Sequence, residues 1–505
     1  MLSILHQLTE KLRWSALRDM APTALAVLAL RDPTQEALAA DVLRVRAKQP
    51  RRAPCGLGLL AAACAATTAP ALADPVNDAQ SAAAGPAAGQ VEADQGWAIH
   101  GQATVVDQAT LAFRSPYRGP NSLDPAARGR ETADVTLYAG VRLWPGMEAW
   151  INPEFDQGFG LSGTLGVAGF PSGEAYKVGR AQPYFRLQRL FFRQTVDLGG
   201  EREKVEADLN QLAGTRAADR LVLTAGKFGV TDVFDTNQYA HDPRADFMNW
   251  ALIDTGTVDY AADAWGYTVG GAAEWYVGRW TLRGGVFNLS KVPNSEHLEY
   301  GFSQFQGVAE IEERHQLGGR PGKLKITGFL SRGRMGAFDD AVALSQTTGQ
   351  PADIAAVRRY GSRSGISLNL EQEVADGVGL FARGGVADGG IEPFEFADID
   401  RTAAAGVSVK GARWGRPNDT VGFGAVVNGI SKTHERFLAA GGTGILVGDG
   451  RLPHPGAEQI LETYYDVAAY GPAHVSLDYQ VVNHPGYNRD RGPVSIVSAR
   501  LHAQF

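Results

Sequence analysis

Cysteine is almost missing from this chain of 505 residues, which has two, and methionine is scarce, with five. Both cysteines, Cys55 and Cys64, lie in one short apolar stretch near the N-terminus. A chain that lost this stretch would carry no thiol, so its stability outside the cytoplasm would not rest on disulfides. Cys64 could mark a lipid-attachment site, but Ala61 stands where leucine is usual, and lipidation is not the favoured interpretation.

Long apolar runs are missing too, because no stretch approaches the roughly 20 residues that a membrane-spanning helix needs. The sequence RRAPCGLGLLAAACAATTAPALADP, residues 51–75, instead has two arginines, a short alanine-rich run and small residues before Asp74. This pattern is typical of a secretory signal that is cleaved after Ala73. We therefore expect a signal peptide at 51–73 and a doubtful N-terminal extension at 1–50, which is either a start codon assigned too early or an unusually long leader.

Basic residues are too few to suggest nucleic acid as a partner. Residues 1–73 hold nine Lys or Arg and five Asp or Glu, so the remainder has 39 basic and 50 acidic side chains, a net charge of −11. Such a surface repels a phosphate backbone. Glycine, by contrast, is abundant, and 61 glycines favour tight turns and close-packed strands over helices.

Alternating apolar and polar residues dominate the rest of the chain. Residues 74–96 are small, polar and low in complexity, which predicts a flexible lead-in before ordered structure near Trp97. In DVTLYAGVRLW, residues 134–144, every second residue is apolar, which predicts a strand with one oily and one polar face. Residues 265–287 and 365–385 each predict two strands that meet in a tight turn, at Gly278-Arg279 and Asp376-Gly377.

The chain ends on SARLHAQF, residues 498–505, where Leu501, Ala503 and Phe505 share a face with Val497 and Ala499. A soluble sandwich could end this way, but such domains span about 100–250 residues. Here one β region covers 97–505, and aromatic residues stand near many strand ends. A barrel in lipid needs these features and a polar second face. We therefore predict an all-β, single-domain transmembrane antiparallel β-barrel over residues 97–505, closed by its last strand.

Several segments resemble the OprB-type family of carbohydrate-selective porins, and together they extend from about Trp97 to Phe505. They include SPYRGPNSL at 115–123, GVRLWPGMEAWINPEFDQGFGLSGTLGVAGFPSGE at 140–174, YFRLQRLFFRQTVDLGGE at 184–201, LTAGKFGVTDVFDTNQYAHDPRADFMNWAL at 223–252 and LDYQVVNHPGYNRDRGPVSIVSARLHAQF at 477–505.

The resemblance implies a monomeric barrel of about sixteen strands in the bacterial outer membrane. Its lumen would pass sugars and other small polar solutes by diffusion, without a cofactor. The C-terminal Phe505 resembles the terminal signature that the outer-membrane assembly machinery recognises. The expected partners are therefore small solutes, outer-membrane lipid and that machinery.

Candidate pore-lining residues follow from the inward face of such a barrel. In WINPEFDQG, Asn152, Glu154 and Asp156 share one face and could accept hydrogen bonds from sugar hydroxyls, or merely hydrate the wall. The spacing of Arg186, Arg189 and Arg193 does not fit strict alternation, which predicts a bulge or an error in the assigned phase of the strand.

We expect two of these three arginines to set a transverse field across the lumen, while the alternative is salt bridging between neighbouring strands. Tyr138, Trp144 and Trp150 share faces with polar residues and could stack on sugar rings, although aromatics near strand ends are more often interface anchors. The segments 121–132 and 155–182 could be loops that fold inward.

Other functions remain as alternatives. Glu154 and Asp156 could be imagined as a glycosidase pair, but two carboxylates two residues apart occur by chance in most proteins, and we expect no enzyme. No metal-ligand cluster is predicted. A general or ion-selective porin without a sugar preference is the main alternative, and a soluble periplasmic sugar-binding β-protein is the other.

Overall fold

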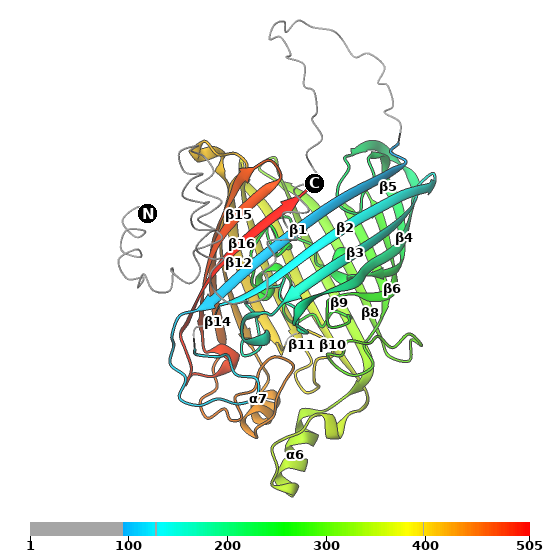
Figure 1. The fold of residues 1–505 in the computed structure, drawn as a ribbon. Helices are drawn as coiled ribbons and strands as arrows, with labels where there is room; N and C mark the ends of the chain where they lie inside the picture. Colours follow the sequence, from blue (N-terminus) through cyan, green and yellow to red (C-terminus); the bar gives the residue numbers. More distant parts are fainter. Residues whose placement is uncertain (1–93, 127–128, 397) are drawn as a thin grey trace, which may run out of the picture.

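The structure is a computed structural model that describes residues 94–126, 129–396 and 398–505. The predicted extension at 1–50, the signal peptide at 51–73 and most of the lead-in at 74–96 lie outside the described residues. The described chain forms a closed antiparallel β-barrel of sixteen strands, shown in Figure 1. Each strand pairs with its sequence neighbours, and the last strand pairs with the first. The predicted all-β barrel of about sixteen strands is confirmed.

The strands follow one another around the barrel in sequence order. The first eight are β1 (Trp97–Thr110), β2 (Arg130–Trp144), β3 (Met147–Gly158), β4 (Arg180–Val205), β5 (Gly214–Phe228), β6 (Thr268–Val277), β7 (Trp280–Asn288) and β8 (Phe305–Leu317). The next eight are β9 (Arg320–Met335), β10 (Arg359–Ala375), β11 (Val378–Ala387), β12 (Arg401–Lys410), β13 (Thr420–Gly429), β14 (Glu458–Tyr470), β15 (Ala473–Asn483) and β16 (Val494–Gln504).

The outer surface of the barrel is apolar and its inner wall is polar, the reverse of a soluble protein. On β2, Leu137 is exposed while its neighbour Thr136 is buried, and on β15 Leu477 is exposed while Gln480 is buried. This alternation recurs around the barrel because successive side chains of a strand point to opposite faces. An outward apolar surface around a polar interior is the pattern of a barrel in lipid.

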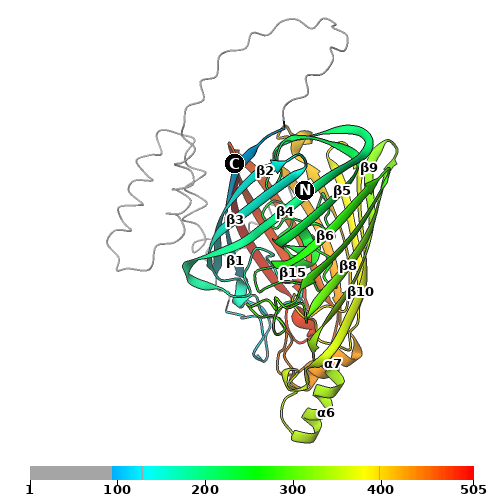
Figure 2. The ribbon, with the colours of Figure 1, turned by 90° about the vertical axis from the view of Figure 1, so that its right-hand side faces the viewer.

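The two ends of the barrel differ in the length of their connections. At the end where the C-terminus lies, strands join through short turns such as Gly278-Arg279 and Asp376-Gly377, as the sequence predicted. Gly377 takes φ of +65° there, a conformation that glycine adopts without a steric penalty. Long loops occupy the opposite end (Figure 2). We call these the short-turn end and the long-loop end.

The closure of the barrel uses the last residue of the chain. The backbone N–H of Phe505 donates to the Gly101 carbonyl at 2.9 Å, and the Gly101 N–H donates back at 2.8 Å. The ring of Phe505 lies directly over Gly101, where a Cβ would stand 2.6 Å from it. Glycine therefore makes the room that the terminal aromatic ring occupies on β1.

Helices are few and short in the described part of the chain. They are α5 (Trp250–Ile253), α6 (Phe338–Thr348) and α7 (Lys432–Ala439). The Ser431 hydroxyl caps α7 by accepting from the His434 N–H. At the long-loop end α6 packs on α7 through Phe338, whose ring stacks on His434. Among residues 94–126, 129–396 and 398–505, no helix combines the length and the apolar character needed to cross a bilayer.

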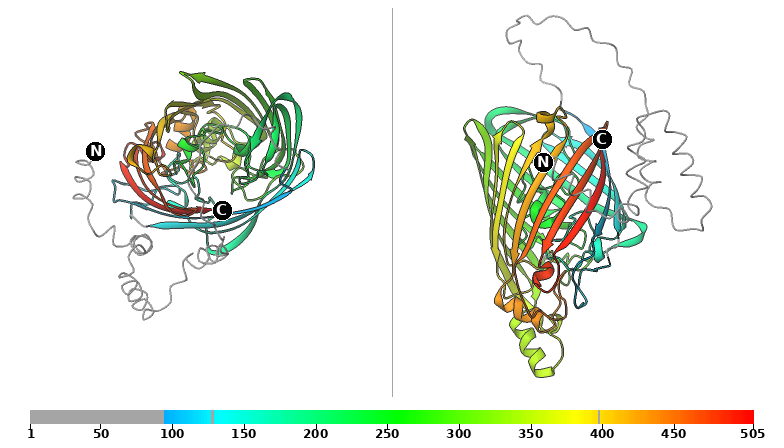
Figure 3. Two further views of the ribbon diagram at one scale, coloured as in Figure 1. Left: turned by 90° about the horizontal axis from the view of Figure 1, so that it is seen from above. Right: turned by 90° about the vertical axis from the view of Figure 1, so that its left-hand side faces the viewer.

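Two long loops lie inside the ring of strands, as the left view of Figure 3 shows. We call residues 159–179, between β3 and β4, inner loop 1, and residues 229–267, between β5 and β6, inner loop 2. Most of their residues are buried. Phe247 of inner loop 2 packs edge-on against wall residues Phe381 and Tyr464, with ring centroids 5.3 and 5.0 Å away. The hydrophobic core therefore sits within the barrel.

Inner loop 2 corrects one strand boundary. The alternation from Trp265 predicted a strand from that residue onward, but β6 begins at Thr268. Trp265 and Tyr267 belong to the loop and cluster there with Tyr176 of inner loop 1. Trp265 and Tyr267 are two residues apart, as in a strand, but the packing of the two inner loops against each other places them, and not pairing with a neighbouring strand.

Candidate functional site

Carboxylates of the barrel wall hold the inner loops in place. Glu458 on β14 is fully buried and accepts hydrogen bonds from the backbone N–H groups of Ala168 and Gly169, at 3.0 and 2.8 Å. Glu462, four residues further along the same inward face, accepts from the N–H of Met248 at 2.5 Å. Hydrogen bonds to a charged acceptor are stronger than neutral ones, so the wall offsets the cost of burying loop backbone.

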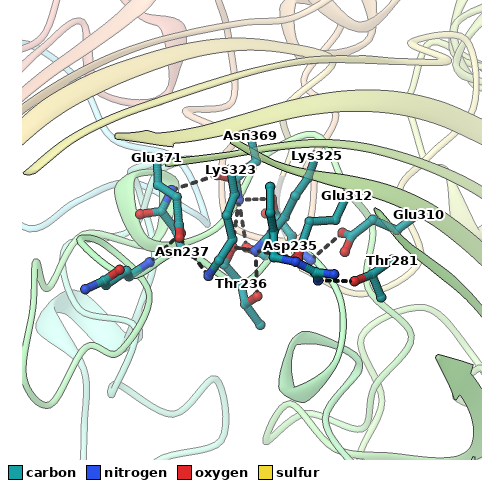
Figure 4. A network of polar contacts seen from close by, with 12 residues as sticks. Asp235, Thr236, Asn237, Thr281, Glu310, Glu312, Lys323, Lys325, Asn369 and Glu371 are labelled. Atoms are coloured by element: carbon teal, nitrogen blue, oxygen red, sulfur yellow. Dashed lines mark hydrogen bonds and ion pairs between the residues drawn. The ribbon is translucent and has the colours of Figure 1, made fainter. Parts of the chain in front are cut away.

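The first part of inner loop 2 is held in the same way by side chains of β8, β9 and β10, and Figure 4 shows this network. The Asp235 N–H donates to Glu310 at 2.8 Å, and Asn369 donates to the Asp235 carboxylate at 2.6 Å. Lys325, which is 1% exposed, donates to both the carbonyl and the hydroxyl of Thr236. Strands β8 to β10 thus bind this loop through hydrogen bonds of their charged and polar side chains.

A bulge on β4 brings three arginines to the inner face. Asn152 of β3 pairs with Arg189 and Pro153 with Leu187, so one extra residue, Gln188, stands on β4. This confirms the bulge that the arginine spacing predicted. Because the bulge shifts the alternation by one, Arg186 and Arg189 both face inward although they are three residues apart.

Arg186 and Arg189 contact inner loop 2. Arg186 donates to Asp263 at 2.9 Å, and its guanidinium carbon lies 3.5 Å from the centroid of the Trp265 ring. Arg189 makes a two-bond contact with Asp232, at 2.8 and 2.6 Å, and lies 4.9 Å from the ring of Tyr267. Each arginine is therefore fixed between a carboxylate and an aromatic face.

Arg193 has different surroundings. It donates to the Asn210 carbonyl at 2.8 Å, in the turn between β4 and β5, and stands 4.0 Å from Glu148 on the neighbouring strand. It therefore lies toward the short-turn end, away from inner loop 2. The three arginines do not form one cluster.

Four carboxylates, from β2, β3 and the two inner loops, surround Arg244 of inner loop 2. Glu174 of inner loop 1 lies 3.0 Å from the guanidinium, Asp134 of β2 at 3.8 Å and Glu154 of β3 at 4.0 Å. Asp242 completes the set at 3.9 Å. Burial raises the pKa of the Glu174 carboxyl, and the Arg244 guanidinium opposes this rise. Arg244 thus joins both inner loops to the wall.

The predicted polar row on β3 lies behind this arginine. Asn152, Glu154 and Asp156 all face inward and are at most 2% exposed. Glu154 accepts from the Thr136 hydroxyl and from the Gln188 amide, the latter at 2.7 Å. Its oxygens are therefore already engaged by the wall.

The predicted aromatic residues separate into two groups. Tyr138 and Trp150 face inward and are buried, and the Trp150 ring covers Gly140. Trp144 lies beside the turn at the short-turn end, 53% exposed, and its indole N–H donates to Gln194 at 2.9 Å. Trp144 is thus apart from the inner loops and the arginines that contact them.

Solvent reaches charged side chains on more than one part of the inner wall. The side chains of Arg186 and Asp232, beside inner loop 2, are 23% and 27% exposed. Lys323 on the inner face of β9 is 37% exposed, whereas Arg363 and Arg383 are 1% and 0% exposed. Accessible charges therefore occur beside strands β3 to β5 and also on β9.

The sequence did not indicate Arg244, Glu174 or Asp263 as site residues. All three lie in the inner loops, and their roles depend on contacts with strands far away in the sequence. The available signal was indirect: residues 229–267 form a long stretch without the alternation found elsewhere, yet they are rich in both aspartate and aromatic residues.

Comparisons with known proteins agree with this architecture. The sequence model of the family described as "Carbohydrate-selective porin, OprB family" matches residues 120–505. The solved structure of Pseudomonas putida OprB at high pH superposes with a TM-score of 0.60 at 16% identity, covering 81% of this chain and 94% of that one. At this identity the superposition shows a shared fold.

A more distant solved structure is the outer-membrane channel DcaP of Acinetobacter baumannii, with a TM-score of 0.44 at 11% identity, covering 81% of this chain and 97% of that one. A search among curated proteins gives no match.

Proposed function

The chain belongs to the carbohydrate-selective porin family OprB, and from this premise we propose that sugars cross the outer membrane through the charged space between the inner loops and strands β3 to β5. Membership makes the protein a passive channel for sugar diffusion. The proposal concerns where the solute passes and which side chains it meets. Its support is the presence of partly exposed charged side chains there, with Arg186 at 23% and Asp232 at 27%.

The observation that carries the proposal is the arrangement of Arg186, Trp265 and Asp263. The Arg186 guanidinium, whose side chain is 23% exposed, lies against the buried face of Trp265 and beside the buried carboxylate of Asp263. A sugar has hydroxyls that both donate and accept hydrogen bonds, and ring faces that stack on aromatics. Arg186 can donate to the oxygens of a sugar, while Asp263 and Trp265 hold the guanidinium in place.

Charges of both signs border this space as contact ion pairs. Arg189 and Arg186 stand on the wall, with Asp232 and Asp263 opposite them on inner loop 2. We propose that these pairs set a transverse field and that Arg244 extends it toward the acidic wall. Asn152, Glu154 and Asp156 support Arg244 from behind, and Tyr138 lines the same wall.

We propose that the protein does not act as a glycosidase. Such an enzyme needs two carboxyl groups free to act on a glycosidic bond. Glu154 is almost fully buried and its oxygens accept from Thr136 and Gln188, so it serves the wall. A general porin without a sugar preference remains the second candidate, because accessible charges of both signs also suit small ions.

The cellular context of the barrel forms part of the proposal. The family implies the bacterial outer membrane, and we propose secretion by the segment 51–73, assembly through the strand that ends in Phe505, and a monomeric channel. In this orientation the short turns face the periplasm and the long loops face outward.

Liposome swelling with sugars of increasing size tests the proposal. We expect Arg186→Gln combined with Arg189→Gln to weaken discrimination between a monosaccharide and a trisaccharide, because the solute loses two donors and the loop loses two anchors. Arg202→Gln is the matched control, since Arg202 lies on the same strand but its side chain is 57% exposed beyond the inner loops. Equal discrimination by the double variant and the control would reject the proposed pathway.

A further inference from the structure

Two arginines point outward from the barrel where its apolar surface ends. On β9, Leu324, Ile326 and Leu330 are exposed on the outer face. Arg332 and Arg334 continue the same alternation toward the long-loop end, and both are exposed. We call these two residues the rim pair. Because they follow Leu330, the last apolar residue on the outward face of β9, they stand at the level where a membrane-embedded barrel leaves the hydrocarbon.

The rim pair has no acidic partner among the described residues. Arg332 donates to the Ser362 hydroxyl at 3.1 Å, and its guanidinium carbon lies 5.2 Å from the Tyr360 ring centroid. The Arg334 guanidinium makes no polar contact in the described part of the chain, where only its backbone N–H donates, to Gln304. The outward face thus carries two cations. Arg332 contacts a hydroxyl and an aromatic ring, and neither cation is neutralised by a carboxylate of the described residues.

Other arginines near this end are satisfied by the protein itself. Arg358 contacts Glu392 at 2.8 Å, and Arg359 contacts Asp340. The outward Arg401 donates to the Ile430 carbonyl at 2.5 Å. Several cations at this end of the barrel therefore have local acceptors, whereas Arg332 and Arg334, like Arg114 and Arg489, have no carboxylate partner in the described part of the chain.

We propose that the rim pair binds the phosphate of an anionic glycolipid headgroup in the outer leaflet. Residues two apart on a strand stand about 7 Å from each other, so both guanidiniums can reach one phosphate group or its immediate neighbours. Guanidinium binds phosphate through two parallel hydrogen bonds, and clusters of arginines are a known basis for lipid headgroup recognition.

The neighbouring residues fit the same ligand. Register places Tyr360 opposite Arg334 and Ser362 opposite Arg332 on β10. Tyrosine is favoured where lipid meets water, and the Ser362 hydroxyl can donate to headgroup oxygens. The apolar surface directly below the rim pair places any occupant within the leaflet, which favours a lipid over a soluble anion or a protein.

The inference rests on the proposed orientation, in which the long-loop end faces outward, and it is independent of how sugars pass the lumen. The test uses protein purified from outer membranes as wild type, as Arg332→Gln/Arg334→Gln and as Arg334→Gln alone. Arg279→Gln/Arg413→Gln serves as the charge-matched control, because both of these arginines are exposed at the short-turn end. Each variant is first checked for heat-modifiable migration, which reports a folded barrel.

Binding is then measured by native mass spectrometry against a bis-phosphorylated glycolipid, the same glycolipid without phosphates, and inorganic phosphate as a competitor. We expect the double variant to bind the phosphorylated lipid about tenfold more weakly than wild type, and the control to bind like wild type. Arg334→Gln, whose side chain makes no internal contact, should give an intermediate loss without any effect on folding.

Three results would overturn the inference: equal binding by the double variant, equal binding of the dephosphorylated lipid, or displacement by inorganic phosphate at matched concentration, which would indicate a free-anion site. Sugar conductance is recorded on the same samples. If the wild-type protein binds no phosphorylated lipid but conducts sugars, the rim site alone is rejected. If the wild-type protein does not conduct sugars, the proposed function is rejected.

Discussion

Replacing Arg244 with glutamine should make the channel more selective for cations. Arg244 is the cation among Asp134, Glu154, Glu174 and Asp242, at distances of 3.0 to 4.0 Å. Glutamine removes its charge but retains a side chain that can donate hydrogen bonds. The carboxylates that remain would attract cations and repel anions in the accessible part of the lumen.

The size of this effect follows from Coulomb's law. For an ion that passes about 7 Å from the guanidinium, the interaction is about 0.6 kcal/mol in bulk water. Loss of the charge lowers the energy of a passing cation and raises that of an anion by this amount, about 1.2 kcal/mol together. We therefore expect the cation-to-anion permeability ratio to rise about sevenfold, and further where the local dielectric constant is lower than that of water.

Reversal potentials in a salt gradient measure this ratio directly. Arg244→Lys should keep the wild-type ratio because it keeps the charge, although it loses the planar fork. Arg279→Gln removes a cation at the β6–β7 turn, 66% exposed, and should also leave the ratio unchanged. An Arg244→Gln channel with the wild-type ratio would refute the reasoning, since the charge would then not face the permeating ions.

Three further expectations concern the loops, the closure and the orientation. Glu458→Ala removes the acceptor of three buried backbone N–H groups, each contributing about 1–3 kcal/mol, so inner loop 1 should loosen and single-channel current should become larger and noisier. Gly101→Val would collide with the Phe505 ring and should lower the yield of heat-modifiable barrel. Gln346→Cys on the exposed part of α6 should react with a membrane-impermeant maleimide in intact cells.

Each of these has a matched control in the chain. Gln459→Ala changes the outward neighbour of Glu458 and should leave the current unchanged. Gly284→Val places a side chain in open space on the outer face and should assemble normally. Arg279→Cys at the short-turn end should stay unlabelled until the membrane is permeabilised. Variants that match their controls would argue, in turn, against loop anchoring, against closure at Gly101 and against the orientation.

The strands could be predicted from the sequence because their signal is local. Alternation in residues 134–144 is imposed by the two faces of a single strand, one toward lipid and one toward the lumen. The β4 bulge could also be predicted, because Arg186 cannot share a face with Arg189 and Arg193 in a regular strand. The family resemblance supplied the strand number, which alternation alone does not fix.

The inner loops could not be predicted in the same way. Their position depends on wall carboxylates distant in sequence, such as Glu462, which binds the N–H of Met248, and Glu310, which binds that of Asp235. No periodic pattern in the neighbouring sequence indicates such contacts. Arg244 and Asp263 were missed for this reason, and Trp265 was assigned to a strand although it packs between loops.

Single-channel recording with sugar tests the central claim most directly. Protein from outer membranes is inserted into a planar bilayer, and mono-, di- and trisaccharides are added to one side. We predict discrete current steps that each sugar reduces, with a weaker reduction when Arg186 and Arg189 are replaced by glutamine. Steps that no sugar changes, from a barrel shown to be folded, would contradict a sugar pathway along these arginines.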